Sequence, residues 1–369
     1  MTGRPLNLYT LAVWASQTSP TNDASPATPP IIPSVGFTYE AAHDAERVLG
    51  DDTLGYVYAR HGAPTQAAWE EAIASLEGAD AAISFGSGMA ALHAALLTAV
   101  SPGGVIVAAE QLYGATRNLL KWLSGSMNIT VHYANFLNGE TTHRTIMAAR
   151  PSAVICEVLT NPLVRVVPVD EIAQSAHEAG AKLIVDNTFA TPFLLRPLET
   201  GADLVVHSAT KYLNGHGDVL GGVVAGSSGL LQTVRGHRKL LGAMLGPFEA
   251  WLALRGLRTL AIRMQQSCLN ACLIAAWLSS QERIKQVYYP GLKTDPGHAV
   301  AKRLFRQDSF GGMLAFEIDG LEREGAFAFM ERLAIIRPVT SLGDVNSLIA
   351  HPATSSHRAL TPSERAAQG

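Results

Sequence analysis

The sequence predicts an α/β fold: a mostly parallel sheet in a large domain, helices on both faces of that sheet, and a smaller C-terminal α+β domain. Short apolar runs end abruptly in polar residues, as at 182–187 and 204–211, and amphipathic stretches of helical period separate such runs. This βαβ alternation implies right-handed crossovers and a sheet covered by helices. Residues 311–318 alternate like a strand of a separate α+β unit, which predicts the smaller domain.

The composition is that of an ordinary globular enzyme. The chain has 369 residues, enough for two or three domains; 47% are hydrophobic, 16% are charged, and the net charge is -3. This charge gives no support to binding of nucleic acid or of an anionic membrane. The first residues lack the apolar core of a signal peptide, and no run of 18 apolar residues follows, so we expect a cytoplasmic protein that does not span a membrane.

Closely spaced prolines interrupt the first 60 residues, and we expect residues 1–60 to form an irregular N-terminal arm. Proline fixes φ and lacks a backbone donor, which breaks helices and strands. The arm ends in Tyr58 and Arg60, which alternate along an expected extended segment. A planar guanidinium suits phosphate, because it can donate two hydrogen bonds at once. The prolines that interrupt the arm include Pro20, Pro26, Pro29, Pro30 and Pro33.

Residues 61–247 are predicted to form the large domain, beginning with a helix that Thr65 caps and Gly78 ends. The small residues of 84–90 then open a second helix that runs to about Val100. Glycines at a helix start let backbone N–H groups approach an anion, and the helix dipole favours phosphate there. The apolar face of the first helix consists of Trp69, Ile73 and Leu76.

Residues 248–369 are predicted to form the smaller C-terminal domain, beginning with a helical stretch over 248–280.

The three cysteines are expected to be buried free thiols, because no further metal ligands accompany Cys268 and Cys272 and because Cys156 lies in an expected buried strand. Strands are expected at 105–108, 153–158 and 221–225, and a helix at 169–179. Core candidates in the helical stretch are Leu252, Leu254, Leu257, Leu260, Ile262 and Met264.

Two polar residues are expected at one edge of the predicted sheet. Asp186 ends one apolar run and Lys211 closely follows another, and ligands bind outside the carboxyl ends of parallel strands. Pyridoxal phosphate (PLP) needs a lysine amine for its Schiff base and a carboxylate at its pyridine nitrogen. Lys211 suits the first role and Asp186 the second, and the hydroxyls of Ser208 and Thr210 can donate to the cofactor phosphate.

Two motifs resemble those of the Cys/Met-metabolism family of PLP enzymes. They are Val185-Asp186-Asn187-Thr188-Phe189 and the stretch from His207 to His216. The resemblance runs from about Tyr39 to the last residue, and it implies the fold-type-I architecture of PLP enzymes. Members of the family include cystathionine γ-synthase, cystathionine γ-lyase, methionine γ-lyase and O-acetylhomoserine sulfhydrylase.

The resemblance also implies roles for particular residues. Tyr113 would stack on the pyridine ring and take part in proton transfer, and Asn161 would bind the ring oxygen. Tyr58 and Arg60 would reach the phosphate of a neighbouring subunit, which implies at least a dimer and, as is usual in the family, a homotetramer built from two dimers with shared active sites. The remaining implied contacts are Gly88 and Met89 with the phosphate, and Ser341, Tyr58 and Val57 with the substrate.

The C-terminal end departs from the family pattern. After the stretch from Thr340 to Pro352, the resemblance implies a last strand with an arginine that binds the substrate carboxylate, and then a final helix. The sequence stops at Gly369, so both elements are expected to be lacking; either the sequence is truncated, or another residue takes the place of that arginine. Arg337 and Arg358 are candidate replacements for that arginine. A PLP-binding protein without turnover, as an inactive partner in a hetero-oligomer, is therefore an alternative to an enzyme.

Four positions bear on the branch of the family. Cystathionine-handling relatives have an acid at the position of Val57 and tend to have a glutamate at that of Asn346, and an unpaired buried ammonium is costly. Methionine γ-lyases have a cysteine where this chain has Ala115, and the family usually has asparagine at the position of Ala63. The stretch from Ser341 to Pro352 is similar to methionine γ-lyases and homoserine-ester sulfhydrylases, so we expect γ-elimination or γ-replacement of the methionine γ-lyase or O-acetylhomoserine sulfhydrylase type. Cystathionine γ-synthase or γ-lyase activity and β-elimination are the alternatives.

Overall fold

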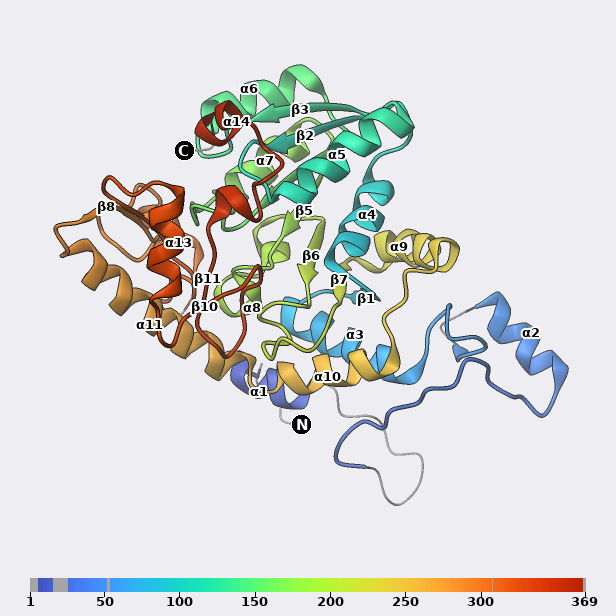
Figure 1. The fold of residues 1–369 in the computed structure, drawn as a ribbon. Helices are drawn as coiled ribbons and strands as arrows, with labels where there is room; N and C mark the ends of the chain where they lie inside the picture. The colour runs from blue at the N-terminus through green and yellow to red at the C-terminus, as the bar shows by residue number, and fades with distance from the viewer. Residues whose placement is uncertain (1–5, 16–25, 52–53, 307, 368–369) are drawn as a thin grey trace.

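A seven-stranded sheet forms the centre of the larger part of the protein in the computed structural model (Figure 1). The structure describes residues 6–15, 26–51, 54–306 and 308–367. The strand order is β1-β7-β6-β5-β4-β2-β3, and β7 alone runs antiparallel to its neighbours among these strands. The strands are β1 (Ala81–Phe85), β2 (Val105–Ala109), β3 (Thr130–Ala134), β4 (Ala153–Glu157), β5 (Lys182–Asp186), β6 (Leu204–Ser208) and β7 (Gly222–Gly226).

Helices cover both faces of this sheet, which confirms the predicted α/β class. The connections from β1 to β2 and from β2 to β3 run in one direction along the sheet, and those from β3 to β4 and from β4 to β5 run in the other. Right-handed crossovers therefore place α4 and α5 on one face and α6 and α7 on the opposite face. The helices of this part are α3 (Pro64–Glu77), α4 (Gly88–Ala99), α5 (Gly114–Met127), α6 (Gly139–Ala149), α7 (Val169–Glu178), α8 (Thr191–Leu194), the 3₁₀ helix η2 (Pro197–Thr200) and α9 (Ser228–Leu241).

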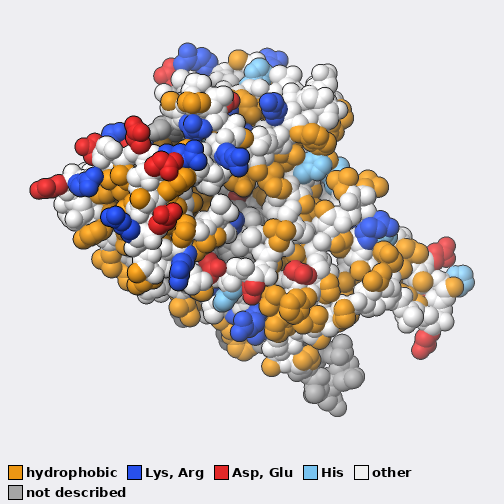
Figure 2. All heavy atoms as spheres, viewed as in Figure 1, with side chains coloured by type: hydrophobic (Ala, Val, Ile, Leu, Met, Phe, Trp, Pro, Cys, Tyr) orange, Lys and Arg blue, Asp and Glu red, His pale blue; other side chains and the backbone are white. Residues whose placement is uncertain are grey.

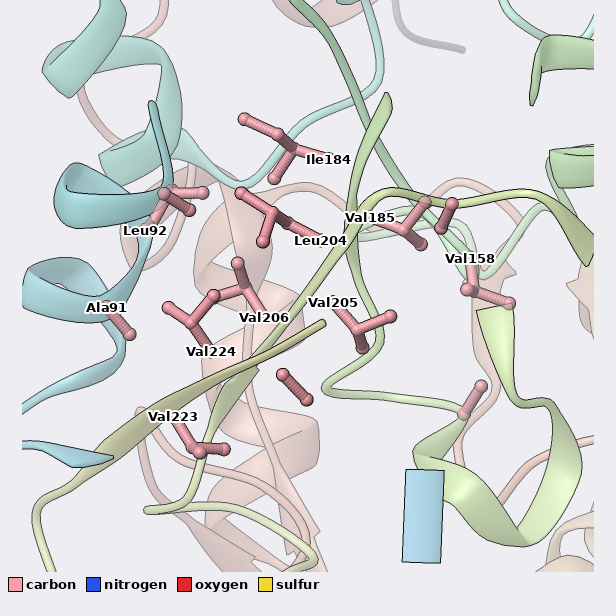
Figure 3. Packing of buried hydrophobic residues seen from close by; sticks show 14 of the residues in the cluster. Ala91, Leu92, Val158, Ile184, Val185, Leu204, Val205, Val206, Val223 and Val224 are labelled. Carbon is pink, nitrogen blue, oxygen red and sulfur yellow. The ribbon is translucent and has the colours of Figure 1, made fainter. Parts of the chain in front are cut away.

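The core lies between the sheet and these helices. Apolar side chains in β4–β7 are almost completely buried, as expected for a parallel sheet that is covered on both faces. In Figure 3, Leu204 and Val206 of β6 extend toward α4, where Leu92 and Ala91 lie, and Val205 points to the other side. This alternation decides which residues at the end of each strand face α4.

The C-terminal part contains two small sheets and several helices. Strands β8 (Ile284–Tyr288) and β9 (Ala315–Ile318) pair antiparallel, and β10 (Arg337–Pro338) pairs with β11 (Leu348–Ile349). The helices are α10 (Pro247–Leu257), α11 (Leu260–Ser279), α12 (His298–Leu304), α13 (Arg323–Glu331), η3 (Pro352–Thr354) and α14 (Pro362–Ala367). The division into an arm and two domains stays a prediction.

The N-terminal 60 residues are more regular than predicted. Helix α1 (Leu8–Trp14) buries Leu8 and Ala12 and contacts α3 and α11, and α2 (Ala42–Gly50) precedes the Tyr-x-Arg segment. Both helices lie outside residues 20–33, where the prolines gather, so those prolines do not interrupt them. Pro20 lies outside the described residues, as does Gly369.

Three local predictions are wrong. Helix α3 begins with Pro64, and Thr65 does not cap it: its buried hydroxyl accepts a hydrogen bond from Ile32 N and donates to Pro30 O. Cys156 and Cys268 are buried as predicted, but Cys272 is exposed. The stretch 248–280 is two helices, and Ile262 points to the surface because α11 restarts the helical phase after Thr259. Among the described helices, none is long and apolar enough to span a membrane.

Candidate active site

A cavity of about 1480 Å³ opens at the carboxyl ends of β4, β5 and β6. Asp186 and Lys211 both line it, so the structure confirms that these two residues emerge at one edge of the sheet. Ligands of open α/β sheets bind at such edges. Nine of the predicted site residues line this cavity: Gly88, Met89, Tyr113, Asn161, Asp186, Ser208, Thr210, Lys211 and Ser341.

Lys211 lies on a loop that leaves β6 and returns in β7. The base of this loop is closed, because Ser208 pairs with Gly222 and Ala209 N donates to Gly221 O at 2.9 Å. The Nζ of Lys211 donates to the Oγ of Ser341 at 3.1 Å. Burial lowers the pKa of Lys211, since desolvation disfavours the ammonium form. A larger fraction of the side chain is then the free amine that attacks a carbonyl.

Asp186 is fixed at the end of β5 by the residue two positions later. Thr188 N donates to Asp186 Oδ1 at 2.9 Å, and the Thr188 hydroxyl also hydrogen-bonds to this carboxylate. The same hydroxyl accepts from Ser208 N at 2.8 Å, which joins the ends of β5 and β6. Burial raises the pKa of Asp186, and the Thr188 contacts oppose that rise. Sequence reasoning missed Thr188, although a threonine two residues after an aspartate is a common turn partner.

Glu157 is a second buried carboxyl at this edge, and it was not predicted. It pairs with Asp186 in the register of β4 and β5, and it accepts hydrogen bonds from Tyr113 N at 2.6 Å and Asn161 N at 3.1 Å. Burial and then the neighbouring Asp186 raise the pKa of Glu157. Glu157 thereby anchors two loops that carry predicted site residues. Its position at the end of an apolar strand, the signal used for Asp186, could have identified it.

The start of α4 has the predicted form of an anion site. Ser87 caps the helix, with its Oγ accepting from Ala90 N at 3.1 Å, and Gly88 is the first helical residue. A Cβ at Gly88 would lie 2.8 Å from Ser208 Cβ, so only glycine allows α4 to approach the end of β6 this closely. Backbone N–H groups at this end therefore face the cavity edge together with Ser208.

Two side chains at the edge differ in their availability to a ligand. Thr210 Oγ1 already accepts from Gly221 N at 3.1 Å and is 3.3 Å from Gly221 O, so its hydroxyl helps to close the lysine loop. The Tyr113 side chain is 40% exposed at the start of α5, which leaves a ring face accessible from the cavity. An amine, a carboxylate, an exposed ring and a helix N-terminus are the set of groups that PLP requires.

Comparison with known proteins decides the family. The model of the Cys/Met metabolism PLP-dependent enzymes matches residues 9–369. The chain belongs to this family. It is 38% identical to the O-succinylhomoserine sulfhydrylase of Pseudomonas aeruginosa over 98% of this chain and 88% of that protein. It is 36% identical to the L-methionine gamma-lyase of Pseudomonas putida over 92% of this chain and 85% of that protein.

Solved structures of the family share the whole fold. The structure of cystathionine gamma synthase from Xanthomonas oryzae pv. oryzae in complex with cystathionine is 37% identical, with a TM-score of 0.92 over 99% of this chain and 92% of that one. The cystathionine gamma-lyase of Lactobacillus plantarum complexed with L-serine is 31% identical, with a TM-score of 0.90 over 99% of this chain. The fold is thus that of fold-type-I PLP enzymes, as predicted.

The Tyr-x-Arg segment lies away from the cavity of its own chain. Neither Val57, Tyr58 nor Arg60 is among the lining residues. The expectation of an extended segment is wrong at Arg60, because His61 N donates to Tyr58 O at 2.8 Å and closes a turn. The guanidinium of Arg60 donates to Lys239 O at 2.7 Å. The role of these residues toward a neighbouring subunit of this PLP enzyme stays a prediction.

The C-terminal part supplies the opposite wall of the cavity. Ser341, Asn346 and Arg358 line it, whereas Arg337 does not, so only one of the two candidate arginines faces the site. Arg358 is exposed and lies near Tyr113 in a second, smaller hollow of about 360 Å³. Beside it, burial lowers the pKa of His357, which favours the neutral imidazole. Among the described residues, this wall therefore presents Arg358 together with two further cations that line the cavity, Arg365 and Lys285.

Proposed function

We propose that this chain catalyses γ-elimination or γ-replacement on a sulfur amino acid or a homoserine ester, with PLP as its cofactor. The observation that carries the proposal is that Lys211, with its lowered pKa, and Asp186 line one cavity at the carboxyl ends of β5 and β6. Relatives with this chemistry in their names match over nearly the whole chain. When bound, PLP would supply an electron sink for the negative charge that develops at the α- and β-carbons of an amino acid.

The residues of this chain have separable tasks in such a reaction. Asp186 holds a proton on the pyridine nitrogen, which requires the carboxylate form that Thr188 supports. Lys211, as a free amine, would remove and return protons at the substrate carbons. Ser341, at hydrogen-bond distance from Lys211 Nζ, orients that amine and lies near the substrate carboxylate. Tyr113 stacks on the ring and assists proton transfer.

The cofactor phosphate has its own set of donors in this proposal. Gly88 and Met89 offer backbone N–H groups at the start of α4, and Ser208 offers a hydroxyl on the facing strand. Thr210 contributes mainly by closing the lysine loop, because Gly221 already occupies its hydroxyl. Asn161, which Glu157 anchors through its backbone, binds the ring oxygen.

Two activities within this chemistry are equally supported. The P. aeruginosa relative is named a sulfhydrylase, and the P. putida relative is named a methionine gamma-lyase. Cystathionine chemistry is the second candidate, since a cystathionine gamma synthase and cystathionine beta-lyases are similar to this chain as well. Val57 and Asn346 argue against it, because neither offers a negative charge to a distal ammonium.

A substrate panel tests the proposal. Purified protein with PLP is incubated with L-methionine, O-acetyl-L-homoserine, O-succinyl-L-homoserine and L-cystathionine, with and without sulfide, and the products are identified by mass spectrometry. Release of 2-oxobutanoate without sulfide indicates elimination, and homocysteine formed only with sulfide indicates replacement. Bound cofactor without any product from the panel would instead indicate a silent PLP-binding partner.

The proposed assembly is a homotetramer of two dimers in which each dimer shares its active sites. Tyr58 and Arg60 lie outside their own cavity, and a surface with exposed apolar side chains lies close by. Figure 2 shows apolar side chains gathered over α9 and α10. Leu240, Leu241 and Phe248 are exposed there, which is typical of a surface that another subunit covers.

Mixed subunits test the shared site. If Arg60 serves the neighbouring site, a hybrid dimer of Arg60→Ala and Lys211→Ala chains has one site with both defects and one without any. Random exchange should then restore about a quarter of wild-type activity, since half of the dimers are hybrids with one intact site. Confirmed exchange without recovered activity would show that Arg60 acts on its own chain or on no active site.

A further inference from the structure

Three fully buried polar side chains meet behind the sheet edge that carries the site. Glu77 is the last residue of α3, Asn187 follows Asp186 after β5, and His207 lies in β6. The Oε1 atom of Glu77 accepts from Asn187 Nδ2 at 3.0 Å and lies 2.5 Å from His207 Nε2. None of the three residues lines the cavity. We call them the Glu77 cluster.

The alternation of side chains along the strands explains this position. Asp186 and Ser208 line the cavity, and their direct neighbours Asn187 and His207 contact α3 on the other side. Each strand end therefore has one side chain on the cavity side and one in the Glu77 cluster. A single carboxylate on α3 holds both ends from behind.

Stability alone does not account for the cluster. Replacing a buried ion pair by apolar side chains of similar size is often neutral or stabilising, so a buried carboxylate and imidazole need another explanation. Within the described residues, Glu77 Oε2, Asn187 Oδ1 and His207 Nδ1 also have no hydrogen-bond partner. Polar atoms without partners are a cost in a buried core.

The contacts of the cluster join the ends of β5 and β6 to each other, to α3 and to the residue that follows α8. Asn187 Nδ2 also donates to Leu195 O at 3.0 Å, and Asn187 N donates to Val206 O at 2.9 Å. On the cavity side, the Thr188 hydroxyl joins the same strand ends through Ser208 N. The two strand ends are thus joined on both faces of the sheet at the level where Asp186 and the lysine loop begin.

We propose that Glu77, Asn187 and His207 form a positioning unit that fixes the Asp186 carboxylate relative to the Ser208–Lys211 segment and so determines cofactor affinity and turnover. This inference rests on the proposed function, because PLP must contact both places at once. The unit touches neither cofactor nor substrate. Its effect is on geometry, and small displacements of a catalytic group can cost as much as 10²-fold in rate.

Two variants loosen the unit, and a third serves as a control. Asn187→Ala removes the amide but leaves the Glu77–His207 pair, and Glu77→Gln keeps the shape but removes the charge. Asp203→Asn is the matched control, because Asp203 joins the same two strands at their amino ends through Leu183 N at 2.8 Å and Lys182 Nζ at 3.0 Å. It weakens the sheet far from the cavity.

The readouts are the Kd for PLP of the apo-protein, kcat and KM of the holoenzyme, and the Tm of both forms. Asn187→Ala and Glu77→Gln should raise Kd about tenfold and lower kcat more than they raise KM. Asp203→Asn should lower the Tm of the apo-protein yet leave Kd and kcat within about twofold, since its contacts are remote from the reacting atoms. The visible absorbance of bound PLP should change in the first two variants only.

Three results would overturn the inference. One is folded Asn187→Ala protein with wild-type Kd and kcat, which decides the matter even if Glu77→Gln does not fold. Another is Asp203→Asn protein whose Kd for PLP rises and whose kcat falls as much as in the two test variants. The changes in all three variants would then reflect a general loosening of the sheet. If wild-type protein binds no PLP, the proposed function fails together with this inference; if it binds PLP and the variants do so equally well, only this inference fails.

Discussion

The two walls of the cavity differ in how firmly they are held. On the sheet side, Glu157 and its neighbours are buried, and hydrogen bonds join each strand end to the next. On the C-terminal side, residues 340–356 are half-buried or exposed, and α13 behind them has no buried residue among those described. We infer that the difference separates two tasks: the sheet edge would hold the cofactor, and the opposite wall would select the substrate. Changes on the sheet side should therefore affect turnover, whereas changes on the other wall should affect substrate affinity.

Removing the amine of the sheet wall should have the largest effect. Lys211→Ala is expected to lower kcat by at least about 10³-fold, because the change removes the amine that the proposed function uses both as nucleophile and as main proton carrier. Product release and the visible absorbance of the cofactor measure it. Lys182→Ala, a lysine at the opposite end of β5, should keep both. Substantial turnover in Lys211→Ala would overturn its assigned role.

Asp186→Asn should rank second. Loss of the charge that stabilises the protonated ring is expected to reduce kcat about 10²-fold with a smaller change in KM, the size typical of one preorganised electrostatic contact. Asp186→Glu, which keeps the charge on a longer side chain, should retain intermediate activity. Steady-state kinetics across the panel measure both variants, and an equal loss in the two would show that position alone matters.

Ser341→Ala tests the contact between the two walls. The Nζ of Lys211 loses an acceptor at 3.1 Å, and one hydrogen bond of ordinary strength corresponds to roughly fivefold in kcat/KM. The Tm of the apo-protein should stay close to that of the wild type, because the residue is only half-buried. A large drop in Tm would mean that this wall is held as firmly as the sheet.

Arg358→Ala changes the C-terminal wall without touching the sheet side, so it tests whether that wall affects substrate affinity. An exposed cation contributes at most about 1 kcal/mol to binding a carboxylate, so KM should rise roughly fivefold or less while kcat is maintained. Arg337→Ala, which does not line the cavity, should leave KM unchanged. A similar KM increase in both variants would indicate a general effect of positive charge on substrate attraction.

Glu157→Gln should have the smallest effect, and on stability rather than on rate. Burial and Asp186 raise the pKa of Glu157 in the folded state. Its stabilising contribution is therefore fully present below the unfolded-state pKa and is lost as the pH rises through the folded pKa. Relative to the wild type, the Tm of apo Glu157→Gln should increase with pH above about pH 4, by a few degrees. Thermal melts of apo-protein across this range test the sign, and a parallel pH dependence in both proteins would contradict it.

The sheet side could be predicted from the sequence because its signal is local. An apolar run that ends in a polar residue marks the carboxyl end of a buried strand, which located Asp186 and the strand before Lys211 without any alignment. Glu157 ends β4 in the same way, but the strand expected from the sequence extends to Val158, which places Glu157 inside the strand and not at its end. The antiparallel direction of β7 and its place between β1 and β6 could not be predicted, because strand pairing depends on distant residues.

Two further differences between expectation and structure originate in long-range contacts, and a third originates in a local turn. Threonine is a common helix cap, but the hydroxyl of Thr65 hydrogen-bonds to the backbone of Ile32 and Pro30 in the arm. His207 belongs to a motif that carries the resemblance, yet its partner Glu77 lies 130 residues away at the end of α3. Arg60 is turned by local backbone hydrogen bonding that residue alternation does not reveal.

The closed loop that carries Lys211 has a mechanical consequence. Both of its ends are anchored on neighbouring strands, at Ser208 and Gly222, so the loop belongs to the rigid frame of the sheet rather than to the C-terminal wall. Among the described residues, two hydrogen bonds link the loop to that wall: Lys211 Nζ donates to Ser341 Oγ at 3.1 Å, and Val345 N donates to Gly215 O at 3.0 Å. Small molecules can then enter and leave on the side of the C-terminal wall while the Nζ of Lys211 keeps its position relative to the sheet.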